Sequence, residues 1–340
     1  MKIRESKMVT KKYKVVITDC DHGSIEEEKK EFGRIGSELI LAQVREEEDL
    51  IRTCKDADGL INQYALLTRG VLERLPNCKV VSRYGVGVDS VDLKAATDLG
   101  IIVANVPDYC MDEVSNQTIA MILTLIRKTV FFDQKVKSNQ WDFHQGIPIY
   151  RLYGKTLGLL GCGKIGLEVA KKISSFGVKV IAFDPYLQNV GEGVELTDFD
   201  TVLKQSDFIS IHCPLNESTR HLIGEEALKK VEKKPILINT SRGPIVDENA
   251  LIQALAEGRV SGAGLDVLEK EPPDPQNPLL KMDTVILSPH VSFYSVESIS
   301  ELKQRTAENV SSVLLGKWPR SVVNREVVGK TKAVITLPHE

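Results

Sequence analysis

The stretch that decides the fold runs from Lys155 to Ala170 and reads Lys-Thr-Leu-Gly-Leu-Leu-Gly161-Cys-Gly163-Lys-Ile-Gly166-Leu-Glu-Val-Ala. An apolar, strand-like run precedes the three spaced glycines, and a helical pattern follows them. Three spaced glycines alone are a weak signal. Here the next strand-like run also ends in an acidic residue, Asp184, eighteen positions after Gly166. This combination predicts a strand–turn–helix–strand unit that binds a dinucleotide.

Each residue of this fingerprint has an expected task. Gly161 permits a tight turn, Gly163 lets the backbone approach a pyrophosphate, and Gly166 lets the helix pack close to the strand. The Asp184 carboxylate is expected to accept hydrogen bonds from ribose hydroxyls and to repel a 2'-phosphate, which favours NAD over NADP. The alternative, a glycine-rich turn without a ligand, leaves the matching strand, helix and acidic residue unexplained.

On both sides of this unit, short runs rich in Val and Ile alternate with helical patterns, which is typical of parallel α/β architecture. The runs are too apolar for half-exposed strands, so helices are expected to cover both faces of each sheet. The first half of the chain contains runs at 15–18, 38–42, 59–62, 80–83 and 101–105. The second contains runs at 157–161, 178–184, 207–212, 235–240, 262–267 and 284–290. Six parallel strands make a complete dinucleotide-binding sheet, so two Rossmann-like or flavodoxin-like domains are expected.

The helical patterns suggest how the two domains are connected. They lie at 25–35, 93–99, 112–137 and 296–315. The last helix is long enough to return to the first domain, which would make that domain discontinuous. We therefore expect a discontinuous first domain at 12–107 and 301–326, with an NAD-binding Rossmann domain at 108–300 inserted into it.

Composition excludes several classes of protein. The chain has 340 residues and a net charge of −3, which gives no bulk attraction to nucleic acid or to an anionic membrane. No apolar run is long enough to span a bilayer, and the basic, polar segment 1–14 lacks the apolar core of a signal peptide. The six cysteines form no CxxC pair or zinc-like spacing, so we expect a cytoplasmic protein without disulfides or a metal site.

Three ionisable residues follow strands of the second set, where ligands bind in open α/β sheets. Arg242 could hold a substrate carboxylate and polarise a neighbouring keto oxygen. Glu271 and His290 lie on adjacent loops, so the carboxylate could orient the ring and favour its protonated form. His290 would then donate a proton during reduction and accept one during oxidation. The alternatives are a surface ion pair for Arg242 and a structural role for His290.

A fourth candidate lies in the first half, where Tyr84-Gly85-Val86-Gly87 follows a strand. Two glycines after a strand expose backbone N–H groups, which could bind an anionic carboxylate. The alternative is an ordinary strand-to-helix turn.

Taken together, these stretches resemble the D-isomer-specific 2-hydroxyacid dehydrogenases, especially the branch of phosphoglycerate dehydrogenase, hydroxypyruvate reductase and the C-terminal-binding proteins. The resemblance spans nearly the whole chain. The matching stretches are YGVGVDSVDLKAA from Tyr84, NVPDYCMDEVSNQTIA from Asn105, GKTLGLLGCGKIG from Gly154, HCPLNESTRHLIG from His212, LINTSRGPIVDENALIQAL from Leu237, GAGLDVLEKEPP from Gly262 and SPHVSFYS from Ser288.

The resemblance makes the first domain, 12–107 and 301–326, the substrate (catalytic) domain, and it implies a role for each matching residue. It makes Arg242 the carboxylate binder, Glu271 the partner of the acid–base His290, and Tyr84, Gly85, Val86 and Gly87 the substrate loop. Glu269 is a second candidate for the carboxylate, but the family motif places its glutamate directly before a proline. The residues expected to contact the cofactor are Gly161, Cys162, Gly163, Lys164, Ile165, Gly166, Asp184, Cys213, Pro214, Thr219, Thr240, Ser241, Asp266 and Thr118. The long helix after Asp112 resembles the family's dimerisation arm, which implies a homodimer.

The expected function is NAD-dependent reduction of a small 2-keto acid, such as hydroxypyruvate, glyoxylate or 3-phosphohydroxypyruvate. Where several phosphoglycerate dehydrogenases have an arginine for the phosphate, this chain has the uncharged Gln63, which argues against a phosphorylated substrate, while Arg83 and Arg127 keep that substrate open. The alternative function is an NAD(H)-sensing scaffold like the C-terminal-binding proteins. The stretch VPDYC resembles those proteins, and Phe293 stands where they have a tryptophan.

Overall fold

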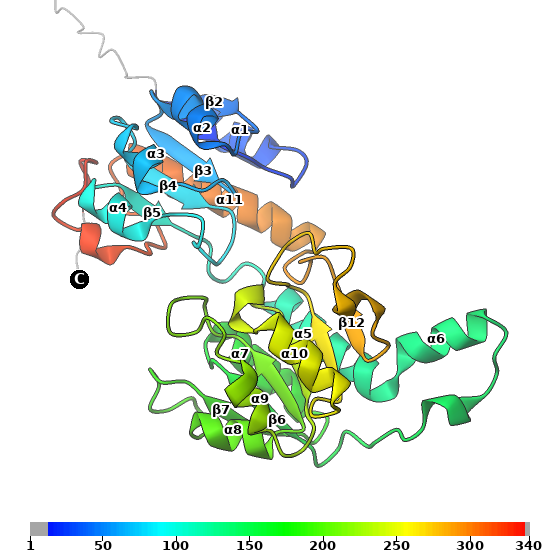
Figure 1. Ribbon diagram of the computed structural model, residues 1–340. Helices are drawn as coiled ribbons and strands as arrows, with labels where there is room; N and C mark the ends of the chain where they lie inside the picture. Colours follow the sequence, from blue (N-terminus) through cyan, green and yellow to red (C-terminus); the bar gives the residue numbers. More distant parts are fainter. Residues whose placement is uncertain (1–12, 337–340) are drawn as a thin grey trace, which may run out of the picture. The chain divides into compact units, whose positions relative to one another are not determined.

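The computed structural model describes residues 13–336, so most of the basic segment 1–14 lies outside the described residues. The chain forms two compact units (Figure 1). The second unit is the continuous stretch Cys110–Tyr294, and the first contains the described residues before and after it. The insertion therefore begins at Cys110 rather than 108 and ends at Tyr294 rather than 300.

The first unit is built on a five-stranded parallel sheet in the order β2-β1-β3-β4-β5. Its strands are β1 (Lys14–Ile17), β2 (Glu38–Leu41), β3 (Gly59–Asn62), β4 (Val80–Arg83) and β5 (Ile102–Ala104). All five were predicted from the sequence, because each is a short apolar run between polar segments. The order is that of flavodoxin-like sheets.

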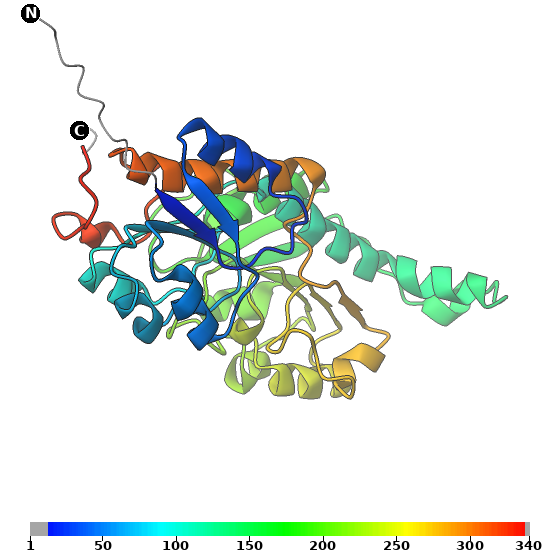
Figure 2. The same cartoon turned by 90° about the horizontal axis from the view of Figure 1, so that it is seen from above.

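Helices cover both faces of this first sheet. They are α1 (Glu26–Arg34), α2 (Glu47–Cys54), α3 (Arg69–Glu73), α4 (Leu93–Asp98) and α11 (Val296–Leu314). A turn of 3-10 helix, η4 (Arg325–Val327), follows α11. One core joins α2, α3 and α4 to the sheet, while α1 and α11 lie side by side against β2, β3 and β4 (Figures 1 and 2). The helix α11 thus belongs to the first unit.

The second unit is built on a seven-stranded parallel sheet in the order β12-β11-β10-β9-β6-β7-β8. Its strands are β6 (Thr156–Leu160), β7 (Lys179–Phe183), β8 (Val194–Leu196), β9 (Phe208–Ile211), β10 (Ile236–Asn239), β11 (Gly262–Leu265) and β12 (Val285–Leu287). The order reverses between β6 and β9, which is the switch point where dinucleotides bind.

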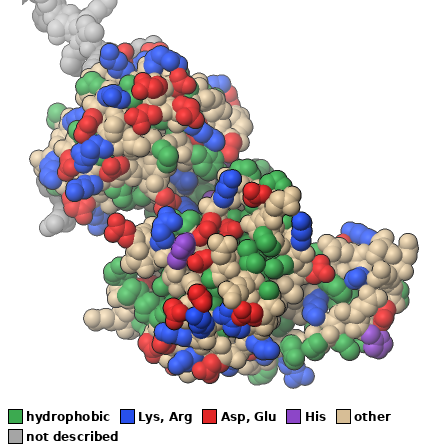
Figure 3. Space-filling view, viewed as in Figure 1, with side chains coloured by type: hydrophobic (Ala, Val, Ile, Leu, Met, Phe, Trp, Pro, Cys, Tyr) green, Lys and Arg blue, Asp and Glu red, His purple; other side chains and the backbone are tan. Residues whose placement is uncertain are grey.

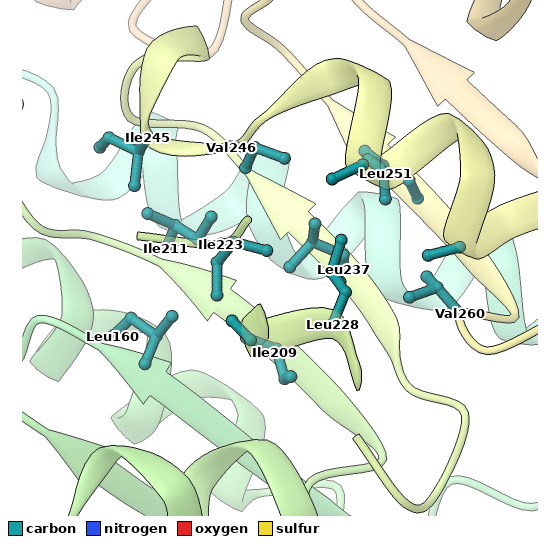
Figure 4. Packing of buried hydrophobic residues seen from close by; sticks show 14 of the residues in the cluster. Leu160, Ile209, Ile211, Ile223, Leu228, Leu237, Ile245, Val246, Leu251 and Val260 are labelled. Carbon is teal, nitrogen blue, oxygen red and sulfur yellow. The ribbon is translucent and has the colours of Figure 1, made fainter. Parts of the chain in front are cut away.

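Two apolar cores hold the second unit together. Its helices are α5 (Met111–Arg127), α6 (Thr129–Lys137), α7 (Lys164–Ser174), α8 (Phe199–Gln205), α9 (Glu225–Lys229) and α10 (Glu248–Ala256). Short 3-10 turns are η1 (Phe143–Gly146), η2 (Gly243–Ile245) and η3 (Pro278–Lys281). One core joins α8, α9 and α10 to one face of the sheet, where aliphatic side chains interdigitate (Figure 4). The other core joins α5 and α7 to the opposite face.

The prediction of six strands in the second half was wrong, because β8 (Val194–Leu196) is a seventh. This strand pairs only with β7, at the edge of the sheet, and none of its residues is buried. A three-residue, half-exposed edge strand lacks the apolar run that reveals buried strands in a sequence.

The prediction of one helix over 112–137 was also wrong. The helix α5 ends at Arg127, its C-cap Lys128 has a left-handed backbone with φ of 54°, and α6 begins at Thr129. Neither glycine nor proline lies at this break, so the sequence carried none of the usual signals for it.

Candidate active site

The glycine-rich turn joins β6 to α7 and has the geometry that the fingerprint requires. Gly161 has φ of +92°, and a Cβ there would lie 2.6 Å from the backbone nitrogen of Cys213. A Cβ on Gly166 would lie 2.6 Å from the Gly161 carbonyl oxygen, so α7 packs directly against the turn. At Gly163 a Cβ would meet none of the described atoms within 4 Å, which leaves this backbone open to a ligand.

The N-terminus of α7 suits a pyrophosphate. Gly163 provides no side-chain cap, and the first turn, which begins with Lys164 and Ile165, contains no acidic residue. Free N–H groups at a helix N-terminus attract anions. Asp184 follows β7, and its carboxylate accepts hydrogen bonds from the N–H of Cys162 at 2.9 Å and of Tyr186 at 3.0 Å. The acidic residue is thereby fixed to the glycine turn.

The loop after β9 borders the same turn. Cys213 lies against Gly161, as the close approach of its nitrogen shows. Farther along, the hydroxyl of Thr219 donates to the Pro214 carbonyl at 2.7 Å and accepts from the N–H of Asn216 at 2.8 Å. Three of the residues expected near the cofactor therefore lie on one internally bonded loop.

The next part of the candidate cofactor site joins residues that are far apart in sequence. The hydroxyls of Thr118, on α5, and Thr240, after β10, lie 3.1 Å apart, and both residues are buried. The Ser241 hydroxyl donates to the Ile211 carbonyl at 2.8 Å. The loops after β9 and β10 are thus tied to each other and to α5.

Asp266, directly after β11, organises the loop that carries His290. Its carboxylate is 2% exposed and accepts hydrogen bonds from the Ser288 hydroxyl at 2.5 Å and from the N–H groups of Val291 and Ser292, both at 2.9 Å. The Asp266 carbonyl also accepts from the N–H of His290 at 2.7 Å. These bonds hold His290 at a left-handed φ of 52°, which non-glycine residues adopt only when their surroundings impose it.

Glu271 and His290 form the pair that their loops suggested. Nδ1 of His290 lies 2.7 Å from Oε2 of Glu271, whose Oε1 accepts from the N–H of Leu268 at 3.1 Å. Both side chains reach solvent, with 29% of His290 and 39% of Glu271 exposed. Because Nδ1 is occupied by the carboxylate, Nε2 is the ring atom that can meet a substrate.

The surroundings of Glu271 favour its charged form. Burial alone would raise the pKa of this carboxyl, but the hydrogen bond and charge of His290, the N–H of Leu268 and the guanidinium of Arg242 outweigh it. The net pKa of Glu271 lies below the usual range of a glutamate. Arg242 therefore belongs to the same electrostatic environment, and its own Nη1 donates to the Ser241 carbonyl at 2.7 Å.

A pocket of about 430 Å³ borders this pair. Its wall is mostly apolar and is completed by four polar residues. The lining residues are Leu268, Pro272, Pro273, Leu280, Leu287, Pro289, Asp266, Glu271, Ser288 and His290. Apolar walls with a few convergent polar groups are typical of small-molecule sites.

The remaining candidates lie in the first unit, in the loop after β4. Gly85 has φ of +134°, its carbonyl accepts from the N–H of Val106 at 3.0 Å, and the Val86 carbonyl accepts from Asn105 at 2.6 Å. The Tyr84 side chain is only 2% exposed, and its hydroxyl donates to Glu28 at 2.6 Å. Tyr84 therefore presents its backbone, rather than its ring, to the loop that ends at Gly87.

At the end of β3, Gln63 is also occupied within the protein. Its side chain is buried, its Oε1 accepts from the N–H of Asp21 at 2.8 Å, and its Nε2 donates to the Asp21 carboxylate. The nearby Arg83 folds back over the substrate loop, since a Cβ on Gly85 would clash with its guanidinium.

Comparison with known proteins agrees with this geometry. Residues 119–292 match the family model described as D-isomer specific 2-hydroxyacid dehydrogenase, NAD binding domain. A glyoxylate reductase of Thermofilum pendens is 42% identical over 293 residues, which cover 83% of this chain and 85% of that protein. The chain belongs to the D-isomer-specific 2-hydroxyacid dehydrogenases. The resemblance found in the sequence is confirmed, and with it the NAD-binding α/β fold.

Other members of the family are similar over most of the chain. A D-3-phosphoglycerate dehydrogenase of Methanocaldococcus jannaschii is 39% identical over 95% of this chain, which covers 63% of that longer protein. Among solved structures, the TT0316 protein from Thermus thermophilus has a TM-score of 0.82 at 30% identity, covering 91% of this chain and 99% of that one. The relatives carry the names of enzymes, which favours the dehydrogenase over the scaffold.

Sequence reasoning missed several residues that shape the site of this dehydrogenase. Ser288 binds Asp266 and accepts from Gln117 at 3.3 Å, and His221 pairs with Glu269 across two loops. Ser288 immediately precedes Pro289-His290 and could have been found by its position after a strand. The partner of His221 could not, because 48 residues separate the pair.

Among residues 13–336, every helix is too short or too polar to span a bilayer. The same residues contain no group of three or more His, Cys, Asp or Glu side chains that could hold a metal ion.

Proposed function

We propose that this dehydrogenase uses NADH to reduce a small, unphosphorylated 2-keto acid of the glyoxylate or hydroxypyruvate type to the D-2-hydroxy acid. The observation that carries the proposal is the 2.7 Å pair of Glu271 and His290, with Arg242 in the same electrostatic environment. An oriented proton donor beside a guanidinium is what reduction of a 2-keto acid requires from the protein.

Each of the three residues has a distinct proposed role. Arg242 binds the substrate carboxylate and polarises the keto oxygen. His290, protonated and oriented through Nδ1 by Glu271, donates the proton on Nε2 to that oxygen, and the oxygen becomes the hydroxyl of the product. NADH, when bound, supplies the hydride that reaches the keto carbon. In the reverse direction, His290 accepts the hydroxyl proton.

The proposed cofactor site consists of the glycine turn, Asp184 and the loops after β9, β10 and β11. The sequence predicted that residues of these elements contact the cofactor. The open backbone at Gly163 and the uncapped N-terminus of α7 support a pyrophosphate at this place. The proposed substrate carboxylate site in the first unit is the backbone of the loop Tyr84–Gly87, which β4 and Asn105 support.

Two observations support an unphosphorylated substrate. Gln63, where several phosphoglycerate dehydrogenases have arginine, is uncharged, and both ends of its amide are bonded to Asp21. A glyoxylate reductase is 42% identical to this chain, slightly more than the 39% of a D-3-phosphoglycerate dehydrogenase. If 3-phosphohydroxypyruvate were nevertheless the preferred acid, Arg83 would be the cation to test.

The test of the function is the loss of NADH absorbance with a panel of acids, for wild type and for His290→Ala. The panel contains glyoxylate, hydroxypyruvate, pyruvate, oxaloacetate, 2-ketoisocaproate and 3-phosphohydroxypyruvate. We expect His290→Ala to lower kcat at least about a hundredfold, because it removes the proton donor, while the Kd for NADH measured by fluorescence stays unchanged. Wild-type turnover in the variant would contradict the proposed mechanism. Binding of NADH without turnover of any acid would instead favour the scaffold.

We further propose a cytoplasmic homodimer. The cytoplasmic location rests on the six cysteines, all of which are free thiols. The dimer rests on the arm formed by α6 and residues 138–153, which projects from the second unit (Figures 1 and 2). No residue of α6 is buried, and hydrophobic side chains are exposed along the arm (Figure 3). A second copy of the chain would cover them.

A further inference from the structure

The loop after β11 carries two glutamates, and each of them pairs with a different histidine. Glu271 binds His290, on the loop after β12. Glu269, two residues earlier, lies with its Oε1 2.5 Å from Nε2 of His221, on the loop after β9. The sequence left both glutamates as candidates for the acid–base partner, and the geometry gives them separate tasks.

The Glu269–His221 pair joins the loop after β11 to the loop after β9. The loop after β10, which carries Arg242, lies between these two loops and contacts both of them. The N–H of His221 donates to the Pro244 carbonyl at 2.9 Å. On the other side, a Cβ on Gly243 would lie 1.9 Å from the Leu268 carbonyl oxygen and 2.5 Å from the nitrogen of Glu269. The loops after β10 and β11 therefore pack backbone against backbone next to Arg242.

Further bonds hold the backbone of Glu269 in this place. The N–H of Glu269 donates to Oε1 of Glu248, the first residue of α10. The other oxygen of Glu248 accepts from the Asn277 side chain at 2.9 Å. His221 has a left-handed φ of 52°, so its own backbone is held in a conformation that its surroundings must impose. These restraints converge on the segment that ends at Glu271.

We infer that Glu269 and His221 are positioning residues for the reaction: their pair fixes the segment 268–271 against the Arg242 loop and so keeps the Glu271 carboxylate on Nδ1 of His290. This inference rests on the proposed roles of Arg242, Glu271 and His290. Glu269 and His221 themselves bond to other protein residues and not to the ring of His290, so they act on the reaction through Glu271.

The size of the effect follows from the exposure of the pair. The side chains of His221 and Glu269 are 45% and 31% exposed, so solvent screens their attraction and an ordinary pair of this kind contributes little. Loss of the pair is therefore expected to lower kcat about fivefold rather than to abolish activity. The KM for NADH is expected to stay the same, because His221 and Glu269 lie on loops that border the proposed cofactor site but neither is among the residues proposed to contact NADH.

A positioning role also predicts a change in the ionisation of Glu271. Glu271 is faced by His290 from the loop after β12, by Arg242 from the loop after β10 and by the N–H of Leu268 from its own loop. Because these groups lower the pKa of Glu271, the ionised pair with His290 persists until the pH falls below the usual glutamate range. A loosened loop weakens these contacts, so the pKa of Glu271 rises and the pair is lost at a higher pH.

The experiment compares two variants that break the pair, Glu269→Ala and His221→Leu, with His221→Gln. Glutamine keeps a hydrogen-bond donor near the position of Nε2, and, like histidine and leucine, it has a Cβ at the left-handed φ of 52°. Lys230→Ala is the matched control, since it breaks a Lys230–Asp200 pair of similar exposure elsewhere in the same unit. The readouts are kcat and KM for wild type and variants, and the titration of the Glu271 carboxyl by carbon NMR, which requires no turnover.

We expect Glu269→Ala and His221→Leu each to lower kcat about fivefold and to raise the pKa of Glu271. The double variant should lose no more activity than either single variant. His221→Gln and Lys230→Ala should keep near-wild-type activity. Unchanged kcat and an unchanged Glu271 titration in Glu269→Ala would overturn it. Failure of the proposed function is separate, because it would appear as full turnover in His290→Ala.

Discussion

At the scale of single residues, Asp184 shows how one side chain can serve both the fold and the cofactor. Its two oxygens accept from the N–H groups of Cys162 and Tyr186, so the carboxylate is fixed beside the glycine turn. The family's acidic residue at this position was predicted from its spacing alone. Its bond to Cys162 was not, because a sequence does not show how a carboxylate rotates at the end of a strand.

Replacing Asp184 with asparagine tests the preference for NADH. The change removes the negative charge that repels a 2'-phosphate, so the ratio of kcat/KM for NADH over NADPH is expected to fall at least about tenfold. Asparagine has one oxygen for two donors, which is expected to cost about 1 kcal/mol of stability. Both coenzymes would be compared in the same assay.

Asp200→Asn provides the control for the cofactor preference, because Asp200 is an exposed carboxylate on α8 that pairs with Lys230. An unchanged ratio in Asp184→Asn, with a changed ratio in the control, would show that long-range charge and not Asp184 selects the coenzyme.

Other residue-level features lie at the limit of what a sequence can predict. The carboxyl ends of parallel strands meet at one edge of a sheet, which is why Arg242, Glu271 and His290 could be chosen from their positions after strands. Their roles in catalysis stay predictions. The contact between Thr118 and Thr240, 122 residues apart, depends on how α5 crosses the sheet and has no local signature.

At the scale of elements, buried strands were predictable and exposed or interrupted elements were not. The strands β3, β9 and β11 are buried at every residue, so their sequences are largely apolar, with Asn62 and Ser210 as the polar residues. The edge strand β8 and the break between α5 and α6 lack such signals. At the break, Lys128 adopts the left-handed conformation that helix ends usually give to glycine.

This break predicts a stabilising substitution. Lys128→Gly removes the steric cost of a left-handed residue with a Cβ, about 1 kcal/mol or more, and loses part of that gain to the greater freedom of glycine in the unfolded chain. We expect a net increase of about 0.5 kcal/mol in the free energy of unfolding, measured by chemical denaturation. Lys128→Ala keeps the Cβ and should gain nothing. An equal gain in both variants would mean that the loss of the lysine charge, and not the backbone, is responsible.

At the scale of the whole molecule, the sequence suggested a discontinuous first domain. The helix α11 follows the last strand of the second sheet and is long enough to return to the first unit. The insertion itself ends six residues earlier than predicted, at Tyr294, since Ser295 begins the capping box of α11. The sequence carried this signal as two serines three positions apart.

The arm predicts how the molecule assembles. Trp141 and Phe143 are 89% and 66% exposed, and a helix without any fully buried residue, such as α6, gains little stability from packing within its own chain. A twofold interface of ordinary size, about 1,200–2,000 Å², would bury these side chains against a second copy. We therefore expect a dimer by light scattering after gel filtration, and a shift towards monomer when Trp141 and Phe143 are both changed to glutamine. Val334→Gln, at a valine that is 94% exposed in the first unit, should leave the dimer intact. A monomeric wild type at micromolar concentration would refute the proposed dimer, and a double variant that stays dimeric would place the interface away from the arm.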